Sequence, residues 1–152
     1  MTITGGGGDA VHRLRPRTLP GQLDALPILA NYVCWAARKA GISTKATYRL
    51  RLAVDEIATN IVIHGYTEAG KKGTLHVSAH WNDSYLTVVL EDIGISYDPA
   101  QTSIPEKLNS PLQERPLGGL GIYLALWGVD EFYYKAFDNS NRSIFLVKRN
   151  DH

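Results

Sequence analysis

The apolar positions of the first 64 residues change from strand spacing to helix spacing. Residues 12–18 (HRLRPRT) alternate loosely, which predicts a strand, and Pro16 indicates a strand at a sheet edge. From Leu23 to Ala37 the apolar residues recur every three or four positions, which predicts a helix ending near Gly41. A second helix is expected from a cap at Ser43 or Thr44 to about His64.

The remainder of the chain predicts two hairpins separated by a long irregular segment. Two β-rich runs flank a polar turn at 81–84, and two more flank a turn at 138–141. Residues 93–117 show no sustained period, and a loop of this length is usually functional or mobile. The stretch PLGGLGIYLALWG then predicts a helix. This order of elements indicates an α+β fold, a mainly antiparallel sheet with helices on one face.

The second predicted helix carries polar residues beside its apolar stripe. In LAVDEIATNIVIHGY, residues 52–66, Val54, Ile57 and Ile61 share the core face. Glu56 and Asn60 are four residues apart and therefore lie one above the other, about a quarter turn from that face. They form a pair at the edge of the core, where solvent could be excluded and a ligand admitted.

The chemistry of this pair leaves alternatives open. A carboxylate and an amide oxygen one turn apart could share a Mg²⁺ ion with waters or phosphates. The carboxylate of Glu56 could instead accept a proton from a hydroxyl group. An E-x-x-x-N pair can also be the solvated edge of an amphipathic helix, and a capping or packing role is expected for His64.

Two further motifs follow at strand and helix ends. In EDIGISYDP, Asp92 leaves a strand and could accept a hydrogen bond from a ring amino group, while Gly94 would let the ring approach the backbone; an Asx turn is the alternative. Gly118, Gly119 and Gly121 precede a helix, whose free N–H groups could bind an anion. The spacing matches neither a Walker loop nor a dinucleotide fingerprint, and a glycine-rich turn is the alternative reading.

Length and charge narrow the class of protein. The chain has 152 residues and a net charge of +1, which fits one domain without the basic excess typical of nucleic-acid or membrane binding. We expect a flexible arm at residues 1–10, which contain GGGGD, and one domain at 11–150. No apolar run approaches a bilayer span, and the single cysteine fits a reducing cytoplasm.

Together, the three motifs resemble the N, G1 and G2 boxes of the GHKL ATPase superfamily, which has the Bergerat fold. E-x-x-x-N on a helix, D-x-G after a strand and G-G-x-G before a helix follow in the family order over roughly residues 20–148. The wording EIATNIVIHGY, EDIGISYDP and GGLGIY is similar to the anti-sigma-factor serine-protein kinases. The resemblance implies a two-layer α/β sandwich that binds ATP beneath a lid, here at about residues 100–117.

The resemblance also implies a role for each motif residue. Asn60 would hold Mg²⁺ at the phosphates, and Glu56 would be the general base toward a serine hydroxyl. Asp92 would bind the adenine amino group beside Gly94. Backbone N–H groups of Gly119 and Gly121 would contact the phosphates.

The partners implied by the resemblance are proteins. Such kinases phosphorylate a serine of a small STAS-type anti-anti-sigma protein, sequester a sigma factor, and are commonly homodimers. Phosphorylation adds nearly two negative charges, which can separate an interface. The alternative function is a nucleotide-dependent binding module that sequesters a partner without phosphoryl transfer.

Overall fold

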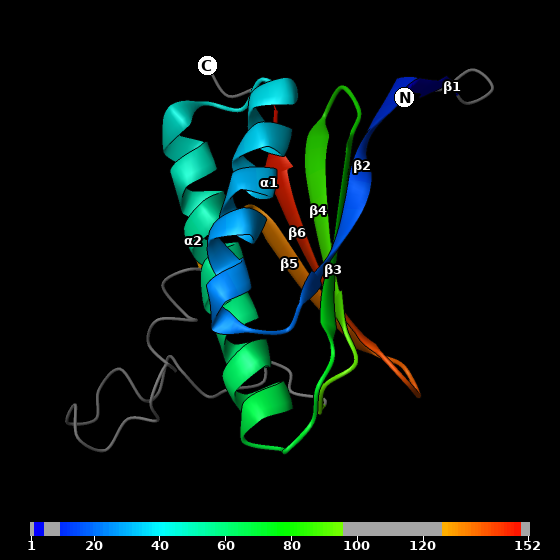
Figure 1. The fold of residues 1–152 in the computed structure, drawn as a ribbon. Helices are drawn as coiled ribbons and strands as arrows, with labels where there is room; N and C mark the ends of the chain where they lie inside the picture. The colour runs from blue at the N-terminus through cyan, green and yellow to red at the C-terminus, as the bar shows by residue number, and fades with distance from the viewer. Residues whose placement is uncertain (1, 5–9, 96–125, 150–152) are drawn as a thin grey trace.

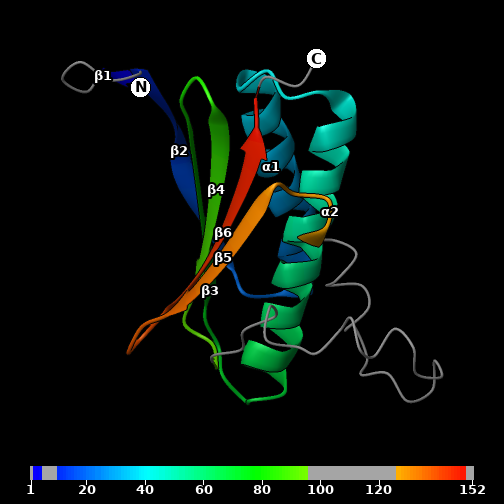
Figure 2. The ribbon, with the colours of Figure 1, turned by 180° about the vertical axis from the view of Figure 1, so that it is seen from behind.

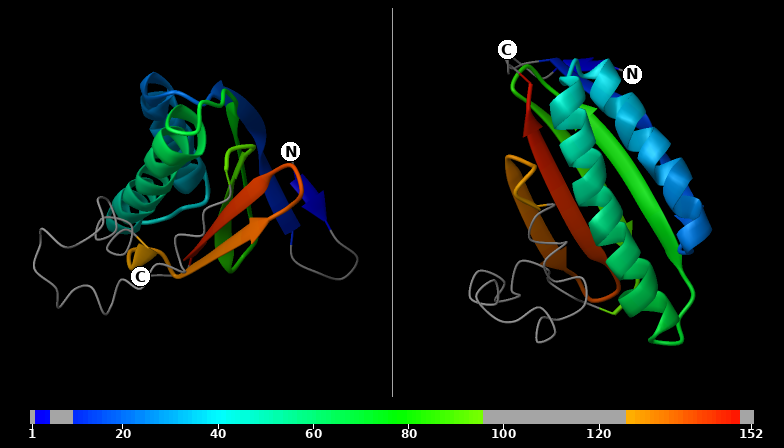
Figure 3. Two further views of the ribbon diagram at one scale, coloured as in Figure 1. Left: turned by 90° about the horizontal axis from the view of Figure 1, so that it is seen from below. Right: turned by 90° about the vertical axis from the view of Figure 1, so that its left-hand side faces the viewer.

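The protein is a layer of two helices packed on one antiparallel sheet. The computed structural model describes residues 2–4, 10–95 and 126–149. In these residues six strands form one sheet in the order β1-β2-β3-β4-β6-β5, and all neighbours are antiparallel. The helices α1 and α2 run side by side across one face of this sheet (Figures 1 and 3). The described residues leave the opposite face without a helix, as the reverse view shows (Figure 2). The α+β sandwich predicted from the sequence is confirmed.

The bounds of the elements agree with most of the sequence predictions. The strands are β1 (Thr2–Thr4), β2 (Ala10–Pro20), β3 (Thr74–Trp81), β4 (Tyr85–Asp92), β5 (Glu131–Ala136) and β6 (Asn141–Lys148). The helical segments are a 3₁₀ turn η1 (Leu23–Ala25), α1 (Leu26–Lys39), α2 (Thr44–Asn60) and a π-helical segment η2 (Ile61–Thr67). Within the described residues, no helix is long and apolar enough to cross a membrane.

Strand alternation sends every second residue of the sheet toward the helices. Toward the start of β4 and the end of β6 the buried positions are apolar, as in the pairs Leu86–Val147 and Val88–Phe145. The same register continues to Leu90–Ser143 and then to Asp92–Asn141. The inner face of the sheet therefore changes from apolar to polar at one end, while it stays buried.

The core faces of α2 and α1 were each predicted in part. Val54 and Ile57 of α2 are fully buried, as expected, and so is Leu50 one turn earlier. Ile61, predicted on the same face, lies in η2 and is only partly buried. In α1 the buried face is Leu29, Tyr32, Val33, Ala36 and Ala37. Leu23, predicted to begin this stripe, is instead 52% exposed, because the chain at 23–25 is a separate 3₁₀ turn rather than the first turn of α1.

The N-terminal strand is an edge strand where its proline occurs. β1 pairs only with residues 10–12 of β2, so among the described residues β2 has no strand neighbour on that side at Pro16. The register of β2 against β3 shifts between Leu14 and Arg17, which brackets the residue that lacks an N–H donor. The flexible arm expected at residues 1–10 and the domain bounds 11–150 stay predictions.

The second helix begins as expected and continues further than expected. Ser43 is its N-cap, and the Ser43 hydroxyl accepts a hydrogen bond from the Ala46 N–H at 3.1 Å. The helix was expected to end at about His64, but the chain continues through Gly65 to Thr67 with wider turns. The backbone N–H groups of Glu68 and Lys71 donate hydrogen bonds to the carbonyl groups of Ile63 and Tyr66, at 2.8 Å each. These bonds span five residues, as in a π-helix, and supply partners for the backbone groups of this wider segment.

We predict that Ser43→Ala lowers the free energy of unfolding by about 1 kcal/mol, because the Ala46 N–H loses its acceptor. Urea denaturation followed by circular dichroism measures this loss. Ser43→Asp keeps an acceptor and is the matched control. Equal stability of the alanine and aspartate variants would contradict the capping role.

Candidate functional site

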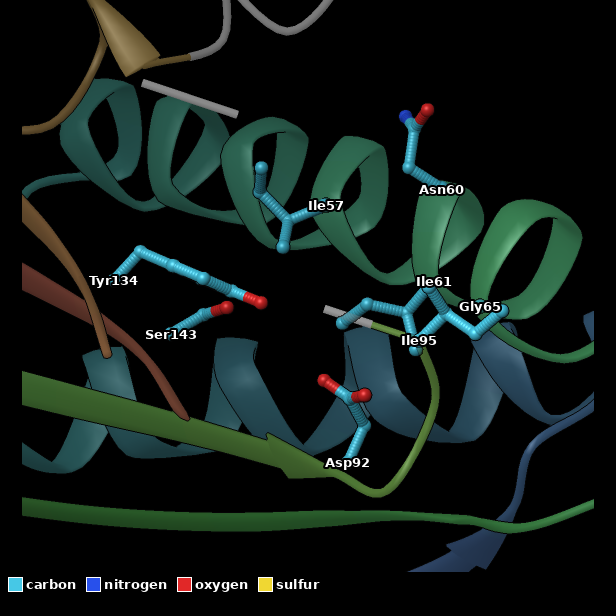
Figure 4. Close-up of a pocket in the computed structure, with 8 residues that line it drawn as sticks. All are labelled: Ile57, Asn60, Ile61, Gly65, Asp92, Ile95, Tyr134 and Ser143. Atoms are coloured by element: carbon cyan, nitrogen blue, oxygen red, sulfur yellow. The ribbon is translucent and has the colours of Figure 1, made fainter. Parts of the chain in front are cut away.

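A pocket lies where the polar end of the sheet meets the end of α2. It contains roughly 310 Å³ of space outside protein atoms, part of it open solvent. The described residues that line the pocket are Ile57, Asn60, Ile61, Gly65, Asp92, Ile95, Tyr134 and Ser143. Figure 4 shows the Asp92 carboxylate and the Ser143 hydroxyl directed into the space between the sheet and the helix. Isoleucine side chains supply apolar walls, so the pocket combines an apolar lining with polar groups.

Asp92 is a buried carboxylate at the end of β4. Asp92 is 4% exposed, and its Oδ1 accepts hydrogen bonds from the Gly94 N–H and from Asn141 Nδ2, each at 2.9 Å. Burial raises the pKa of Asp92 above its ordinary value, against the opposing effects of these two bonds and the charge of Lys71. The carboxylate is therefore desolvated but well supported on one oxygen.

Ser143 contributes a buried hydroxyl that has no hydrogen-bond partner in the part of the chain that the structure describes. Its residue is 1% exposed, and its Oγ makes no hydrogen bond among the described residues. Buried hydroxyl groups are nearly always bonded, so an orphaned one needs an explanation. Because Ser143 lines the pocket two positions along β6 from Asn141, a polar ligand group could supply the missing bond.

Asn60 reaches the pocket from the helix side. Its Nδ2 donates to the Glu56 carbonyl at 2.8 Å, which directs the side-chain oxygen away from the helix. In Figure 4 the Asn60 side chain points away from Asp92, so the two residues lie at different ends of the site. A single amide oxygen fits Mg²⁺, which needs few protein ligands when phosphates and waters complete its shell. The described residues contain no group of three or more His, Cys, Asp or Glu residues that could hold a metal by itself.

Glu56 lies one turn before Asn60 and is half-buried. It is not among the described residues that line the pocket. Burial, and to a lesser degree the neighbouring charge of Asp55, raises the pKa of Glu56 above its ordinary value. A carboxylate with a raised pKa is a stronger base when it is ionised.

The D-x-G turn packs directly on the π-helical segment. A Cβ placed on Gly94 would lie 3.0 Å from three backbone atoms of Gly65, so only glycine fits there without movement. The Ile95 N–H also donates to the Gly65 carbonyl at 3.2 Å. The absence of a side chain at position 94 therefore serves a contact between two backbones, in addition to any room it leaves for a ligand.

Tyr66 connects three parts of this region. Its hydroxyl donates to the Thr74 carbonyl at 2.7 Å and accepts from the Ile93 N–H at 2.8 Å. Its ring lies against Gly21 and Gly73, where an added Cβ would come within 2.6 and 2.5 Å of ring carbons. Tyr66 thus fixes the start of β3 and the turn after Asp92 relative to the helix.

Several predicted features fall outside the described residues. These are Gly119 and Gly121, the lid at about residues 100–117, and the helix expected after the glycines up to residue 125. His64 is described, and its Nδ1 lies 2.7 Å from Glu68 Oε1 one turn further along. The structure therefore brings Asn60 and Asp92 to one pocket. Gly94 lies in the turn between the lining residues Asp92 and Ile95, and Glu56 lies one helical turn before Asn60.

Sequence reasoning missed the contributions of β6 to the pocket. Asn141 was assigned to the polar turn at 138–141, but it is 2% exposed and is the first residue of β6. Asn141 and Ser143 could have been found from the alternation of inward and outward side chains along β6. Both residues share their face with the buried Phe145 and Val147. Two polar residues in core-facing positions of a strand indicate a site.

The fold and this pocket define a two-layer α/β domain with a buried carboxylate at a strand end. Residues 19–148 match the family described as the histidine kinase-like ATPase domain. The match covers most of the chain, and the chain belongs to this family. It is the GHKL-type family that the sequence motifs indicated.

Curated relatives are similar to the chain in sequence, and a solved structure is similar to it in fold. The chain is 27% identical over 110 residues to a serine-protein kinase RsbW of Halalkalibacterium halodurans, covering 70% of this chain and 66% of that protein. It is 26% identical over 109 residues to a serine-protein kinase RsbW of Bacillus cereus, covering 70% and 67%. The histidine kinase domain of a blue-light activated histidine kinase from Erythrobacter litoralis has a similar fold, with a TM-score of 0.53 at 15% identity. This match covers 83% of the present chain and 60% of that one. The chain thus spans about two thirds of the length of these relatives.

We predict that Tyr66→Phe destabilises the protein by about 1–3 kcal/mol, because the Ile93 N–H loses its acceptor next to the pocket. Urea denaturation measures the loss, and amide hydrogen exchange should locate faster opening at Ile93. Tyr48→Phe is the control, since Tyr48 is 59% exposed. Similar losses in both variants would rule out a specific role for the Tyr66 hydroxyl.

Proposed function

We propose that this chain is an ATP-dependent protein-serine kinase, and that its nucleotide occupies the pocket between α2 and the end of β4. The observation that carries the proposal is the buried Asp92 carboxylate, supported on Oδ1 and directed into an apolar slot. Such a group suits a ligand with one N–H donor on a flat apolar body. Adenine has this combination.

The apolar walls support a planar ring. Ile57 and Ile61 come from the helix, and Ile95 follows the D-x-G turn. A purine between these side chains would place its amino edge toward Asp92. Ser143, whose hydroxyl can both donate and accept, would contact the same edge of the base.

The phosphates would extend toward Asn60 and the glycine-rich segment. The side-chain oxygen of Asn60 is a ligand that Mg²⁺ accepts, and the ion would neutralise charge on the phosphates. By resemblance to the family, backbone N–H groups of Gly119 and Gly121 would contact the phosphate oxygens. Phosphoryl transfer depends chiefly on this kind of positioning and charge neutralisation.

Glu56 is the proposed general base. It would accept the proton of a substrate serine as the serine oxygen bonds to the γ-phosphorus and the bond to the leaving ADP breaks. The raised pKa of Glu56 favours proton transfer from a hydroxyl group. Its place one turn from Asn60 would put the base near the phosphate end of the nucleotide.

The proposed substrate is a serine of a STAS-type anti-anti-sigma protein, and the proposed second partner is a sigma factor. This assignment rests on the resemblance to anti-sigma-factor kinases and on relatives named serine-protein kinases. It gives the chain a role in transcription regulation in the cytoplasm. The exposed apolar side chains Ile28 and Trp35 on α1 support a protein-contact surface, and we propose a homodimer.

A binding module without phosphoryl transfer is the second candidate. The position of Glu56 outside the pocket lining favours it, since a base must reach the proton it abstracts. The two candidates share the nucleotide site and differ only in whether a partner becomes phosphorylated.

We predict that ADP or ATP raises the thermal midpoint of the protein, because a ligand bound only by the folded state stabilises it. At a concentration a hundredfold above the dissociation constant the gain is about 2.7 kcal/mol. Differential scanning fluorimetry measures the shift. Asp92→Asn, which places an amide where the carboxylate faces the pocket, should remove it. An equal shift in both proteins would exclude Asp92 from the site.

We predict that Glu56→Gln retains nucleotide binding but reduces transfer of label from γ-labelled ATP to a STAS protein by about 10²–10⁴-fold. In the unmodified protein the rate should fall as the pH is lowered through the raised pKa of Glu56, since the base must be ionised. Asp55→Asn is the control on the same helix. Undiminished labelling by Glu56→Gln would remove Glu56 from the base role, and ATP binding with no label on any partner would favour the module.

A further inference from the structure

The side-chain amide nitrogen of Asn141 donates two hydrogen bonds, one to Asp92 and one to the turn that follows it. Its Nδ2 donates to Asp92 Oδ1 at 2.9 Å and to the Gly94 carbonyl at 3.0 Å. The two residues are direct partners in the β4–β6 ladder, and both are buried. The amide therefore fixes Asp92 and the D-x-G turn together.

The two oxygens of Asp92 differ as a result. Oδ1 receives two N–H donors, from Asn141 and Gly94, which prevents rotation of the carboxylate. Oδ2 receives no hydrogen bond from the described residues, and the carboxylate is directed into the pocket (Figure 4). An ionised oxygen can only accept, so the pocket presents an acceptor at this point.

We infer that Asn141 is a positioning residue for base selection: it holds Asp92 so that Oδ2 selects a purine with an amino group at position 6 over one with a carbonyl group. The inference rests on the proposed function, in which an adenine nucleotide occupies this pocket. An amino group donates to Oδ2, whereas a carbonyl oxygen would meet a second acceptor. A buried oxygen that accepts hydrogen bonds and faces another acceptor has lost its hydrogen bond to water and gains none in return.

A neutral amide suits this role better than a charged residue would. Lys71, which donates to the Ile93 carbonyl at 3.1 Å, is the cation whose charge acts on Asp92. The amide of Asn141 therefore adds a directed donor without a second cation that could bind both carboxylate oxygens.

The loss of Asn141 should also change the protonation of Asp92. The Asn141 bond lowers the pKa of Asp92 against the larger, opposing effect of burial. Without that bond the carboxyl group would hold its proton to higher pH. A protonated carboxyl group can donate to a carbonyl oxygen, so discrimination between the two purines should weaken as the pH falls.

The test is the ratio of the dissociation constants of IDP and ADP, measured by calorimetry on the full chain at several pH values. These nucleotides differ at position 6, which carries a carbonyl group in IDP and an amino group in ADP, and at N1, which carries a hydrogen only in IDP. Asn141→Leu should lower the preference for ADP by roughly tenfold, the size of one lost hydrogen bond. Asn141→Asp is nearly isosteric and places two carboxyl groups together, so its preference should decline at higher pH than in the unmodified protein.

Asn139→Asp introduces the same charge at an exposed position two residues earlier, and it should keep the unmodified ratio and pH profile. An unchanged ratio in both Asn141 variants, or an equal weakening of ADP and IDP, would overturn the positioning role. Failure of the unmodified protein to bind either nucleotide would instead refute the proposed function, and the inference with it. A stability loss alone does not alter the ratio, so this readout separates selection from folding.

Discussion

The polar end of the sheet's inner face is the constraint on which the site depends. Because side chains alternate between the two faces of a strand, residues two positions apart share a face. Asp92 is therefore buried on the same face as Val88 and Leu90. The antiparallel register then places Asn141 opposite Asp92. A shift of one residue in this register would turn the whole polar set to the other face of the sheet. The apolar core that fixes the register therefore also fixes the site.

The end of the helix layer is adapted to the same pocket. The π-helical turns after Asn60 let the chain continue to Tyr66, whose hydroxyl bonds both Thr74 and Ile93. The close contact of Gly65 with Gly94 lets the strand end approach the helix. π-Helical segments occur often at functional sites. Here the segment continues from the helix that carries Asn60 and packs against the turn that carries Gly94. The two walls of the pocket are thus held at a defined separation.

The pocket places polar groups where an apolar core would be more stable. Burial raises the pKa of Asp92, which shows that its charged form is disfavoured by desolvation, and Ser143 Oγ has no partner among the described residues. Such groups are retained where a ligand uses them, and binding then returns part of the lost stability. The protein belongs to a family of ATPase domains, and in the proposed function these two groups would meet the nucleobase.

The sequence alone determined the fold class, the family and the pocket residues that belong to short motifs, because period, caps and motif spacing are local properties. It placed Asn60 and Asp92 at positions that the fold brings to one pocket, about thirty residues apart in the chain. Tertiary structure decided the rest. The sequence places Asn141 in a turn, whereas strand pairing sets it opposite Asp92. The sequence ends the second helix at about His64, whereas the chain continues through Gly65, which packs against the backbone of Gly94. Those contacts join segments far apart in sequence, and local patterns carry no information about which distant partner a residue will meet.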